Sequence, residues 1–222
     1  MFDLLPLRNI EYCIHLMLYL SVHEWAHAYS AWKLGDDTAS REGRLTLNPL
    51  AHIDPIGTVL LPLLGVPFGW ARPVPVNPAR FRRSITIRHG MVITAAAGPA
   101  SNLAMALIAT IGYGLYLRFV PSALVGDGLV ARMVSLSVIL NVVLAIFNML
   151  PIPPLDGSRV ADGLMPARYR PQWERFMQYG GLVLAFVIVA PLLLGFSFLS
   201  YPVQLAQHAL YSMAFWIAGY GA

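Results

Sequence analysis

Three residues in the segment 21–30, SVHEWAHAYS, have the types and the spacing that metal-dependent hydrolysis requires. His23 and His27 are four residues apart, so on a helix both imidazoles lie on one face and can bind one metal ion. Glu24 directly follows the first histidine and can reach a water molecule bound to that ion. The alternative is a set of unrelated polar residues. Because the segment is otherwise apolar, and a charged side chain at the bilayer centre costs about 2.5–3.5 kcal/mol on insertion scales, we expect a functional site.

A catalytic zinc site usually has three protein ligands and one position open for water. Asp156 lies in the run FNMLPIPPLDGSR, where it directly follows a stretch in which three prolines between 151 and 154 halt a helix. An interrupted backbone at membrane depth is tolerated only where it faces protein or a wet cavity, so we expect Asp156 to enter beside the two histidines. An ordinary Asp-Gly turn is the alternative. Other histidines and acids are weaker candidates, because they lie in turns, near helix ends, alone, or too far along the same helix: His15, His52, His89, His208, Asp54, Asp127 and Asp162.

The composition places these residues in an integral membrane protein. Of the 222 residues, 57% are hydrophobic and 12% are charged, whereas a soluble domain of this length carries more polar surface. The net charge of +4 is small and its cations fall in a few loops, which indicates contact with lipid headgroups and argues against nucleic acid. The single cysteine, Cys13, cannot form an internal disulfide. The N-terminal stretch has no small-residue cleavage site, so we expect no removable signal peptide.

We expect an all-α polytopic membrane protein, with one integral-membrane domain over residues 1–222 and about four to six transmembrane helices. Four segments are long and apolar enough to span, at about 9–33, 90–118, 129–150 and 176–199. A further segment at about 203–220 either crosses or lies at the interface, because two glutamines and a histidine interrupt it. The segment at about 55–70, PIGTVLLPLLGVPFGW, is short and holds three prolines and three glycines, so we expect it to be re-entrant.

The distribution of arginines predicts which end of this bundle faces the cytoplasm. Arginines flank the re-entrant segment on both sides and a further group follows the third span, whereas the loop 118–132 is poorer in charge. Since an excess of Lys and Arg marks the cytoplasmic side, we expect the histidine motif to lie nearer that face. The stretches GRLTLNP and ARPVPVNP predict extended pieces and a small β element there. We expect the basic link 159–175 to be a solvated loop facing headgroups, with contact to substrate or anionic lipid as the alternative.

With these motifs the chain resembles the site-two protease family of intramembrane zinc metalloproteases. The resemblance rests on HEWAH in one span, AAAGPASN at the start of another and NMLPIPPLDG near the end of a third, and it covers about residues 9–198. The stretch GRLTLNPLAHIDPIGT is similar to the compact branch without a PDZ domain. The resemblance implies one Zn²⁺ bound by His23, His27 and Asp156, Glu24 as catalytic base, and Asn148 as a group that holds the scissile peptide or its oxyanion. It also implies a prokaryotic cell membrane, with the site facing the cytoplasm.

The expected reaction is hydrolysis of peptide bonds within or next to transmembrane segments, as in regulated intramembrane proteolysis. Glu24 takes the proton of the attacking water and returns it to the leaving amine. The expected partners are a transmembrane protein or peptide substrate and the lipid bilayer, with no nucleic acid and with no oligomeric state set by the sequence. A metal-binding membrane transporter or a non-catalytic scaffold is the alternative, since buried His and Asp also line ion pathways. The re-entrant segment either offers an edge to an extended substrate or is a structural plug.

Overall fold

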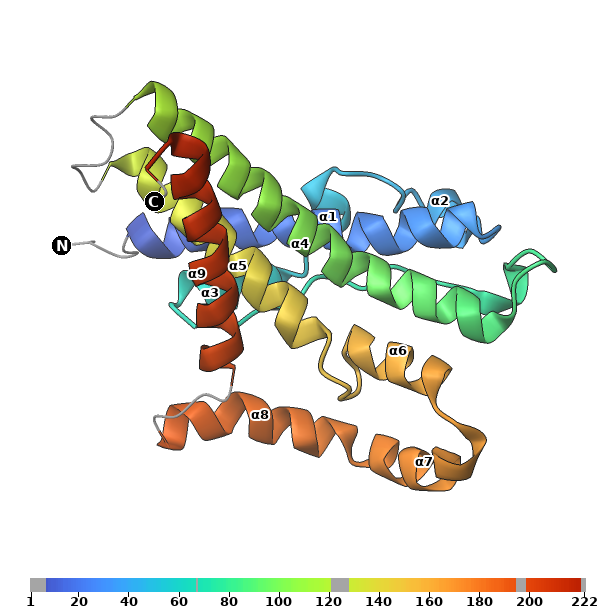
Figure 1. Ribbon diagram of the computed structural model, residues 1–222. Coiled ribbons are helices and arrows are strands. Elements are labelled where there is room, and N and C mark those ends of the chain that lie inside the picture. The colour runs from blue at the N-terminus through green and yellow to red at the C-terminus, as the bar shows by residue number, and fades with distance from the viewer. Residues whose placement is uncertain (1–6, 67, 121–127, 195–198, 221–222) are drawn as a thin grey trace.

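The computed structural model describes residues 7–66, 68–120, 128–194 and 199–220, and every regular element within these ranges is helical (Figure 1). The long helices are α1 (Leu7–Lys33), α4 (Ile87–Phe119), α5 (Leu129–Asn148), α8 (Gly180–Leu194) and α9 (Ser200–Ala218). The shorter elements are α2 (Thr38–Arg41), η1 (Pro49–Ala51), η2 (Pro55–Leu60), α3 (Leu61–Leu63), η3 (Pro78–Arg80), α6 (Asp156–Leu164), η5 (Ala167–Tyr169) and α7 (Arg170–Gln178). The expected all-α class is confirmed.

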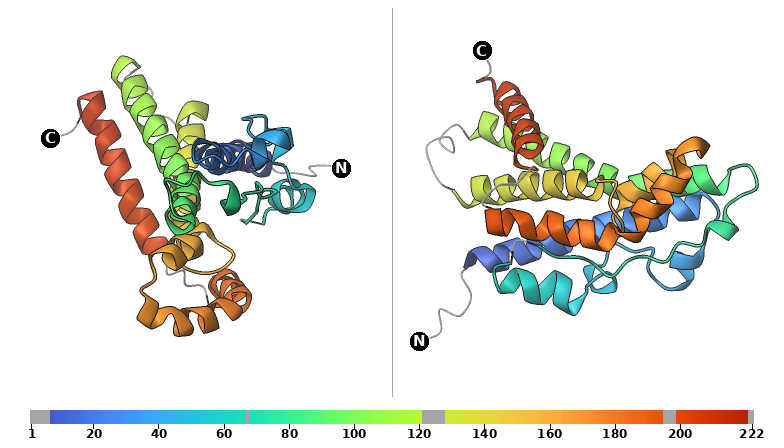
Figure 2. Two further views of the ribbon diagram at one scale, coloured as in Figure 1. Left: turned by 90° about the vertical axis from the view of Figure 1, so that its right-hand side faces the viewer. Right: turned by 90° about the horizontal axis from the view of Figure 1, so that it is seen from below.

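Buried apolar side chains pack α1, α4, α5 and α9 into one bundle. The first cluster joins α1 to α5, and the second joins α4 and α5 to α9, which lies alongside α4 (Figure 2). The first contains Leu16, Tyr19, Leu20, Leu140 and Leu144 together with Ala71. The second contains Ala106, Val138 and Val142, covered by Val203, Ala206 and Leu210. This bundle holds α1 rigidly against α4, which is the contact that forms the site.

Helix α4 is shaped for close approach by its neighbours. A Cβ atom at Gly114 would lie 2.7 Å from the carbonyl oxygen of Ala214 on α9, so a larger residue would push α9 away. Thr86 caps the first turn, where its hydroxyl accepts the His89 N–H at 3.2 Å. Pro99 lies inside the helix and removes one backbone donor. Of the small residues before it, Gly98 lies against α1, where a Cβ would overlap the imidazoles of His23 and His27.

Two of the described helices, α4 and α5, are long and apolar enough to cross a membrane. They correspond to the spans expected at 90–118 and 129–150. The span expected at 176–199 is divided instead: α7 ends at Gln178 and α8 begins at Gly180. A Cβ at Gly180 would lie 2.7 Å from Pro153, so this break lies where the chain packs against the proline-rich turn. Residues 195–198 of that expected span lie outside the described residues.

The segments 52–66 and 68–77, here together called the strap, lie along α1, the first running out and the second returning. Near the start of α1, the Asn9 side-chain amide donates to the Leu63 carbonyl at 3.1 Å. Past the other end of α1, the Asp36 carboxylate accepts the Asn77 N–H at 2.6 Å. The helix between these two contacts, from Asn9 to the end of α1 at Lys33, has a rise of about 36 Å. Whether the strap is re-entrant in a membrane stays a prediction.

The small β element expected from GRLTLNP and ARPVPVNP is not found among the described residues. Pro73 and Pro75 have no N–H group, so the second stretch cannot form a continuous ladder. A side chain replaces the ladder: Arg44 donates through Nη2 to the Arg72 carbonyl at 2.6 Å. The two stretches therefore lie side by side as irregular chain.

The link after α5 is largely helical, so the expected loop over 159–175 is wrong, while its contact with solvent and headgroups stays a prediction. Helix α6 buries Gly157, Ser158 and Gly163, and α7 buries Trp173. The Trp173 indole N–H donates to the Asp162 carboxylate at 3.1 Å and joins the two helices. Helices α6 and α7 are short and amphipathic, so the sequence contains no long apolar run there that would predict them.

Candidate metal centre

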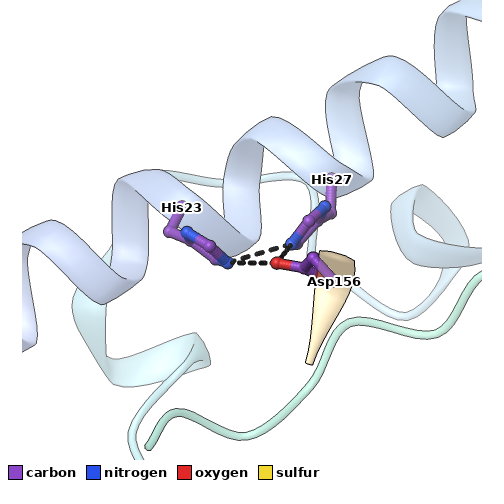
Figure 3. A group of neighbouring side chains, drawn as sticks. All are labelled: His23, His27 and Asp156. Carbon is purple, nitrogen blue, oxygen red and sulfur yellow. Dashed lines mark hydrogen bonds and ion pairs between the residues drawn. The ribbon is translucent and has the colours of Figure 1, made fainter. Parts of the chain in front are cut away.

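His23 and His27 lie one turn apart on the face of α1 that points into the bundle (Figure 3). Their side chains are buried, and their Nε2 atoms are 3.0 Å apart. The 27 residues of α1 include neither glycine nor proline, so an unbroken helix holds the two imidazoles at this spacing. The geometry agrees with the one-face arrangement expected from HEWAH.

Asp156 is the first residue of α6 and reaches the histidines from another element (Figure 3). Its Oδ2 atom is 3.0 Å from Nε2 of His23 and 3.2 Å from Nε2 of His27. Gly157 makes this entry possible, because a Cβ there would overlap the carbonyl group of Met149 at the end of α5. Among the described residues, these are the one group of three His, Cys, Asp or Glu side chains whose ligand atoms gather within 4.8 Å.

The partners of the two Nδ1 atoms determine which nitrogen of each ring carries the proton. Nδ1 of His23 lies 2.6 Å from Oδ1 of Asn102, and Nδ1 of His27 lies 2.7 Å from the carbonyl oxygen of Thr94. Both partners accept hydrogen bonds, so each Nδ1 donates and each Nε2 of a neutral ring presents a lone pair. Two lone pairs and one carboxylate oxygen therefore face each other.

A divalent cation fits these three acceptors. Two imidazoles and one carboxylate form a typical protein ligand set for catalytic zinc. With ligands at about 2.0–2.1 Å in tetrahedral geometry, donor atoms are separated by roughly 3.3 Å, and here the three separations are 3.0, 3.0 and 3.2 Å. A cation between the acceptors would remove the repulsion among them.

A buried chain of hydrogen bonds sets the orientation of Asn102. Its Nδ2 donates to Oδ1 of Asn141 at 3.0 Å, which leaves Oδ1 of Asn102 to accept from His23. The Asn141 amide nitrogen in turn donates to the Ser137 carbonyl at 2.9 Å, and the Tyr19 hydroxyl donates to Oγ of Ser137 at 2.6 Å. Tyr19 is one turn before His23 on α1, so the chain of bonds runs through α4 and α5 and returns to the helix it began on.

Gly98 of α4 forms the wall of the site behind the histidines. A Cβ atom built there would lie 2.6 Å from Nε2 of His23 and would also overlap Nε2 of His27. Helix α4 can therefore approach the metal-facing edges of both rings only because position 98 lacks a side chain.

Glu24 is half-buried beside this group, and its carboxylate contacts the strap. Oε2 of Glu24 accepts the backbone N–H of Val74 at 2.8 Å. Arg44 holds the same stretch through the Arg72 carbonyl, and it is itself only 6% exposed. Burial, and secondarily the charge of Arg72, lowers the pKa of the Arg44 guanidinium, while the carboxylate of Glu24 acts in the opposite direction. The strap, held in place by Arg44, thus determines where the Glu24 carboxylate lies.

Asn148 is the last residue of α5 and is half-buried, and its Nδ2 donates to the Leu144 carbonyl of its own helix at 2.9 Å. No interaction of the described residues joins it to the two histidines.

The weaker ligand candidates have other partners. His15 lies 2.7 Å from the Glu11 carbonyl, and His52 lies in the turn after η1, buried against the Thr46 carbonyl. Asp54 caps η2, and Asp127 lies outside the described residues.

Sequence reasoning missed the residues that position the histidines. Asn102, Thr94 and Gly98 all lie in or beside AAAGPASN, which served only as one motif of the family resemblance. A fully buried asparagine in an apolar helix is itself a signal, because an unpaired amide would be costly there. Its partner was not predictable, since that partner depends on how α4 is rotated against α1.

Comparison with known proteins gives similarity along most of the chain. A family model described as Peptidase family M50 matches residues 118–191. The chain is 42% identical over 194 residues to the Bacillus subtilis (strain 168) protein named "Putative zinc metalloprotease YwhC", with 84% of each chain covered. It is 29% identical over 181 residues to "Putative zinc metalloprotease Rip2" of Mycolicibacterium smegmatis (strain ATCC 700084 / mc(2)155), covering 80% of this chain and 66% of that one. No solved structure matches the chain.

The variant Gly98→Ala separates helix stability from metal binding. Alanine is the better helix former by about 1 kcal/mol, but its Cβ would occupy the space of both Nε2 atoms. We expect zinc affinity, measured by chelator competition, to fall by at least about tenfold. The control is Gly112→Ala on the same helix, where a Cβ would have no atom within 4 Å. Equal zinc affinity of the Gly98→Ala protein and the parent would contradict the close contact of α4 with the two imidazoles at position 98.

The variant Asn102→Leu tests the bond that orients His23. Loss of the acceptor on Nδ1 should weaken zinc binding by about 10–100-fold, measured by the same chelator competition. Asn102→Asp keeps an acceptor and should retain most of the affinity. Thr110→Val is the matched control, because Thr110 is equally buried on α4 but donates only to the Ala106 carbonyl of its own helix. A leucine variant that binds zinc as the parent does would rule out this role.

Proposed function

The chain belongs to peptidase family M50 and is a zinc metalloprotease, and from that premise we propose that its active site is the group formed by His23, His27 and Asp156. The observation that carries the proposal is the convergence of three acceptor atoms, with each imidazole held by a separate hydrogen bond at Nδ1. One zinc ion per chain is the cofactor. The substrates are proteins, and the peptide bonds cut lie within or next to transmembrane segments.

In the proposed mechanism the chain's own groups bind, orient and move a proton. Zinc, when bound, supplies Lewis-acid chemistry: it lowers the pKa of water toward about 7 and polarises the scissile carbonyl. Glu24 takes the proton of the attacking water and returns it to the leaving amine. The Val74 N–H holds one oxygen of that carboxylate, which leaves the other oxygen for the water.

Asn148 is proposed to bind the scissile peptide or its oxyanion. It is the last residue of α5 and Asp156 is the first residue of α6, so the two residues flank the same proline-rich connection. Its amide nitrogen now satisfies the Leu144 carbonyl of its own helix. A rotation about the side-chain bonds would free this donor when substrate enters.

The protein is membrane-associated, and we propose that the whole chain 1–222 forms one multi-pass domain. Helices α1, α8 and α9 would cross the bilayer beside the two apolar spans. Apolar side chains on α8 support this, because Leu182, Phe186 and Leu193 are 73%, 67% and 78% exposed outside a bilayer. The basic residues on both flanks of the strap support a re-entrant strap and an active site that opens to the cytoplasm of a prokaryotic cell.

For the strap, the hydrogen bonds favour a structural role over presentation of substrate. The N–H groups of Arg72, Val74 and Asn77 are already bound to His52, Glu24 and Asp36. A strand that pairs with an extended peptide needs free donors on one edge. The alternative of a metal transporter has less support, since a pathway needs successive sites and the described residues gather one such group.

The variant Glu24→Gln tests the proposed base. It keeps the shape of the side chain but cannot take a proton, so cleavage of a labelled single-span peptide in vesicles should fall by about 10²–10⁴-fold. Zinc content, measured by mass spectrometry of the metal, should stay at one ion per chain. Glu42→Gln, at an exposed position outside the site, is the control. Cleavage by Glu24→Gln at the parent rate would rule out this mechanism.

A further inference from the structure

A cleft of about 340 Å³ lies between α4, α6 and α7, away from the metal-facing residues. It is lined by three arginines, one aspartate, Gly163 and three apolar side chains: Arg88, Arg159, Arg170, Asp162, Ile87, Met91 and Met177. Three positive groups and one negative group give it a formal charge of +2. Of the apolar residues, Ile87 and Met91 lie where α4, one of the two described apolar helices long enough to span, begins, and Met177 lies near the end of α7.

The single acid of this cleft is already paired inside the protein. The Asp162 carboxylate accepts the Trp173 indole N–H at 3.1 Å and lies 3.5 Å from Nη1 of Arg170. Nη2 of Arg170 also donates to the Asp162 backbone carbonyl at 3.2 Å. Arg88 and Arg159 have no carboxylate partner among the described residues. Two guanidinium groups from different helices are therefore free to bind an anion.

The cleft is built by a close helix contact rather than by chance proximity of surface arginines. Gly163 of α6 is buried, and a Cβ there would overlap Val92 of α4 and lie 3.3 Å from the Arg88 carbonyl. This contact brings α6 against the first turns of α4. The positive end of the α4 dipole lies at the same place, and a dipole end of this sign favours an anion.

We propose that this cleft binds the phosphate group of an anionic membrane lipid. Guanidinium groups bind phosphate oxygens through charge-assisted, often bidentate hydrogen bonds. Basic pockets at the ends of spans are suited to lipid headgroups, and Ile87, Met91 and Met177 offer an apolar surface to the glycerol and acyl methylenes. Free phosphate can bind the same guanidinium groups, but it has no apolar part that could contact these three side chains.

A bound phosphate would bridge α4 and α6, because Arg88 lies on one helix and Arg159 on the other. Arg159 is three residues after Asp156, about one turn along α6. The lipid would thus hold the helix whose first residue faces the histidines, without itself touching the metal-facing atoms.

The experiment measures lipid binding directly. The purified full chain in neutral detergent is titrated with phosphatidylglycerol or phosphatidylcholine, and bound lipid is counted by native mass spectrometry. We expect one phosphatidylglycerol per chain to bind more tightly than phosphatidylcholine. The double variant Arg88→Gln/Arg159→Gln should weaken this binding by roughly tenfold or more. The charge-matched control Arg168→Gln/Arg175→Gln changes two arginines outside the cleft and should stay close to the parent.

A second arm distinguishes the two sources of phosphate. Millimolar inorganic phosphate should fail to displace phosphatidylglycerol; if it displaces the lipid completely, the ligand is free phosphate and the lipid proposal is overturned. Equal loss of binding in both double variants, or in neither, would also overturn it. Zinc content and gel-filtration profile should match the parent in all variants, which separates this test from the metal site.

Discussion

Two imidazole lone pairs and a carboxylate oxygen facing one another inside an apolar bundle form the arrangement on which the rest of the structure depends. Such a group is unfavourable by itself, because like partial charges meet without solvent. A divalent cation between them makes it favourable. Each element around the site can be understood from this requirement. The unbroken α1 supplies the ring spacing, Gly157 lets Asp156 approach, and Gly98 lets α4 lie close to the metal-facing edges without a side chain filling that space.

The hydrogen bonds behind the histidines are part of the same requirement. Asn102 and Asn141 are fully buried, and an unsatisfied polar group at such a place costs about 1–3 kcal/mol. Two apolar residues at these positions would pack α4 against α5 without the possible cost of an unsatisfied polar group. The asparagines instead hold His23 in the tautomer that leaves Nε2 free, and Tyr19 closes the chain of bonds on α1. The interior of this bundle is therefore arranged for one ring orientation as well as for packing.

The sequence predicted those parts of the molecule that local spacing determines. HEWAH placed two histidines on one helix face, and the proline-rich turn before Asp156 marked the residue that joins them. The partners at Nδ1 were not predictable, because they depend on the rotation of α4 against α1. The expected β element was wrong for the described residues because its prolines remove donors and Arg44 satisfies the carbonyls. Helices α6 and α7 were missed because burial of glycines and of Trp173 stabilises them, and hydropathy does not record such contacts.

The central claim is that one zinc ion is bound by His23, His27 and Asp156. X-ray absorption at the zinc edge of the purified protein tests it most directly, in the parent and in Asp156→Ala. The account predicts one zinc per chain with two imidazole nitrogens and one or two oxygens at about 2.0–2.1 Å in the parent, and zinc content well below one per chain in the variant after dialysis against a chelator. A sulfur ligand at about 2.3 Å, which only Cys13 or a methionine could supply, or one zinc per chain retained by Asp156→Ala under the same dialysis, would contradict it.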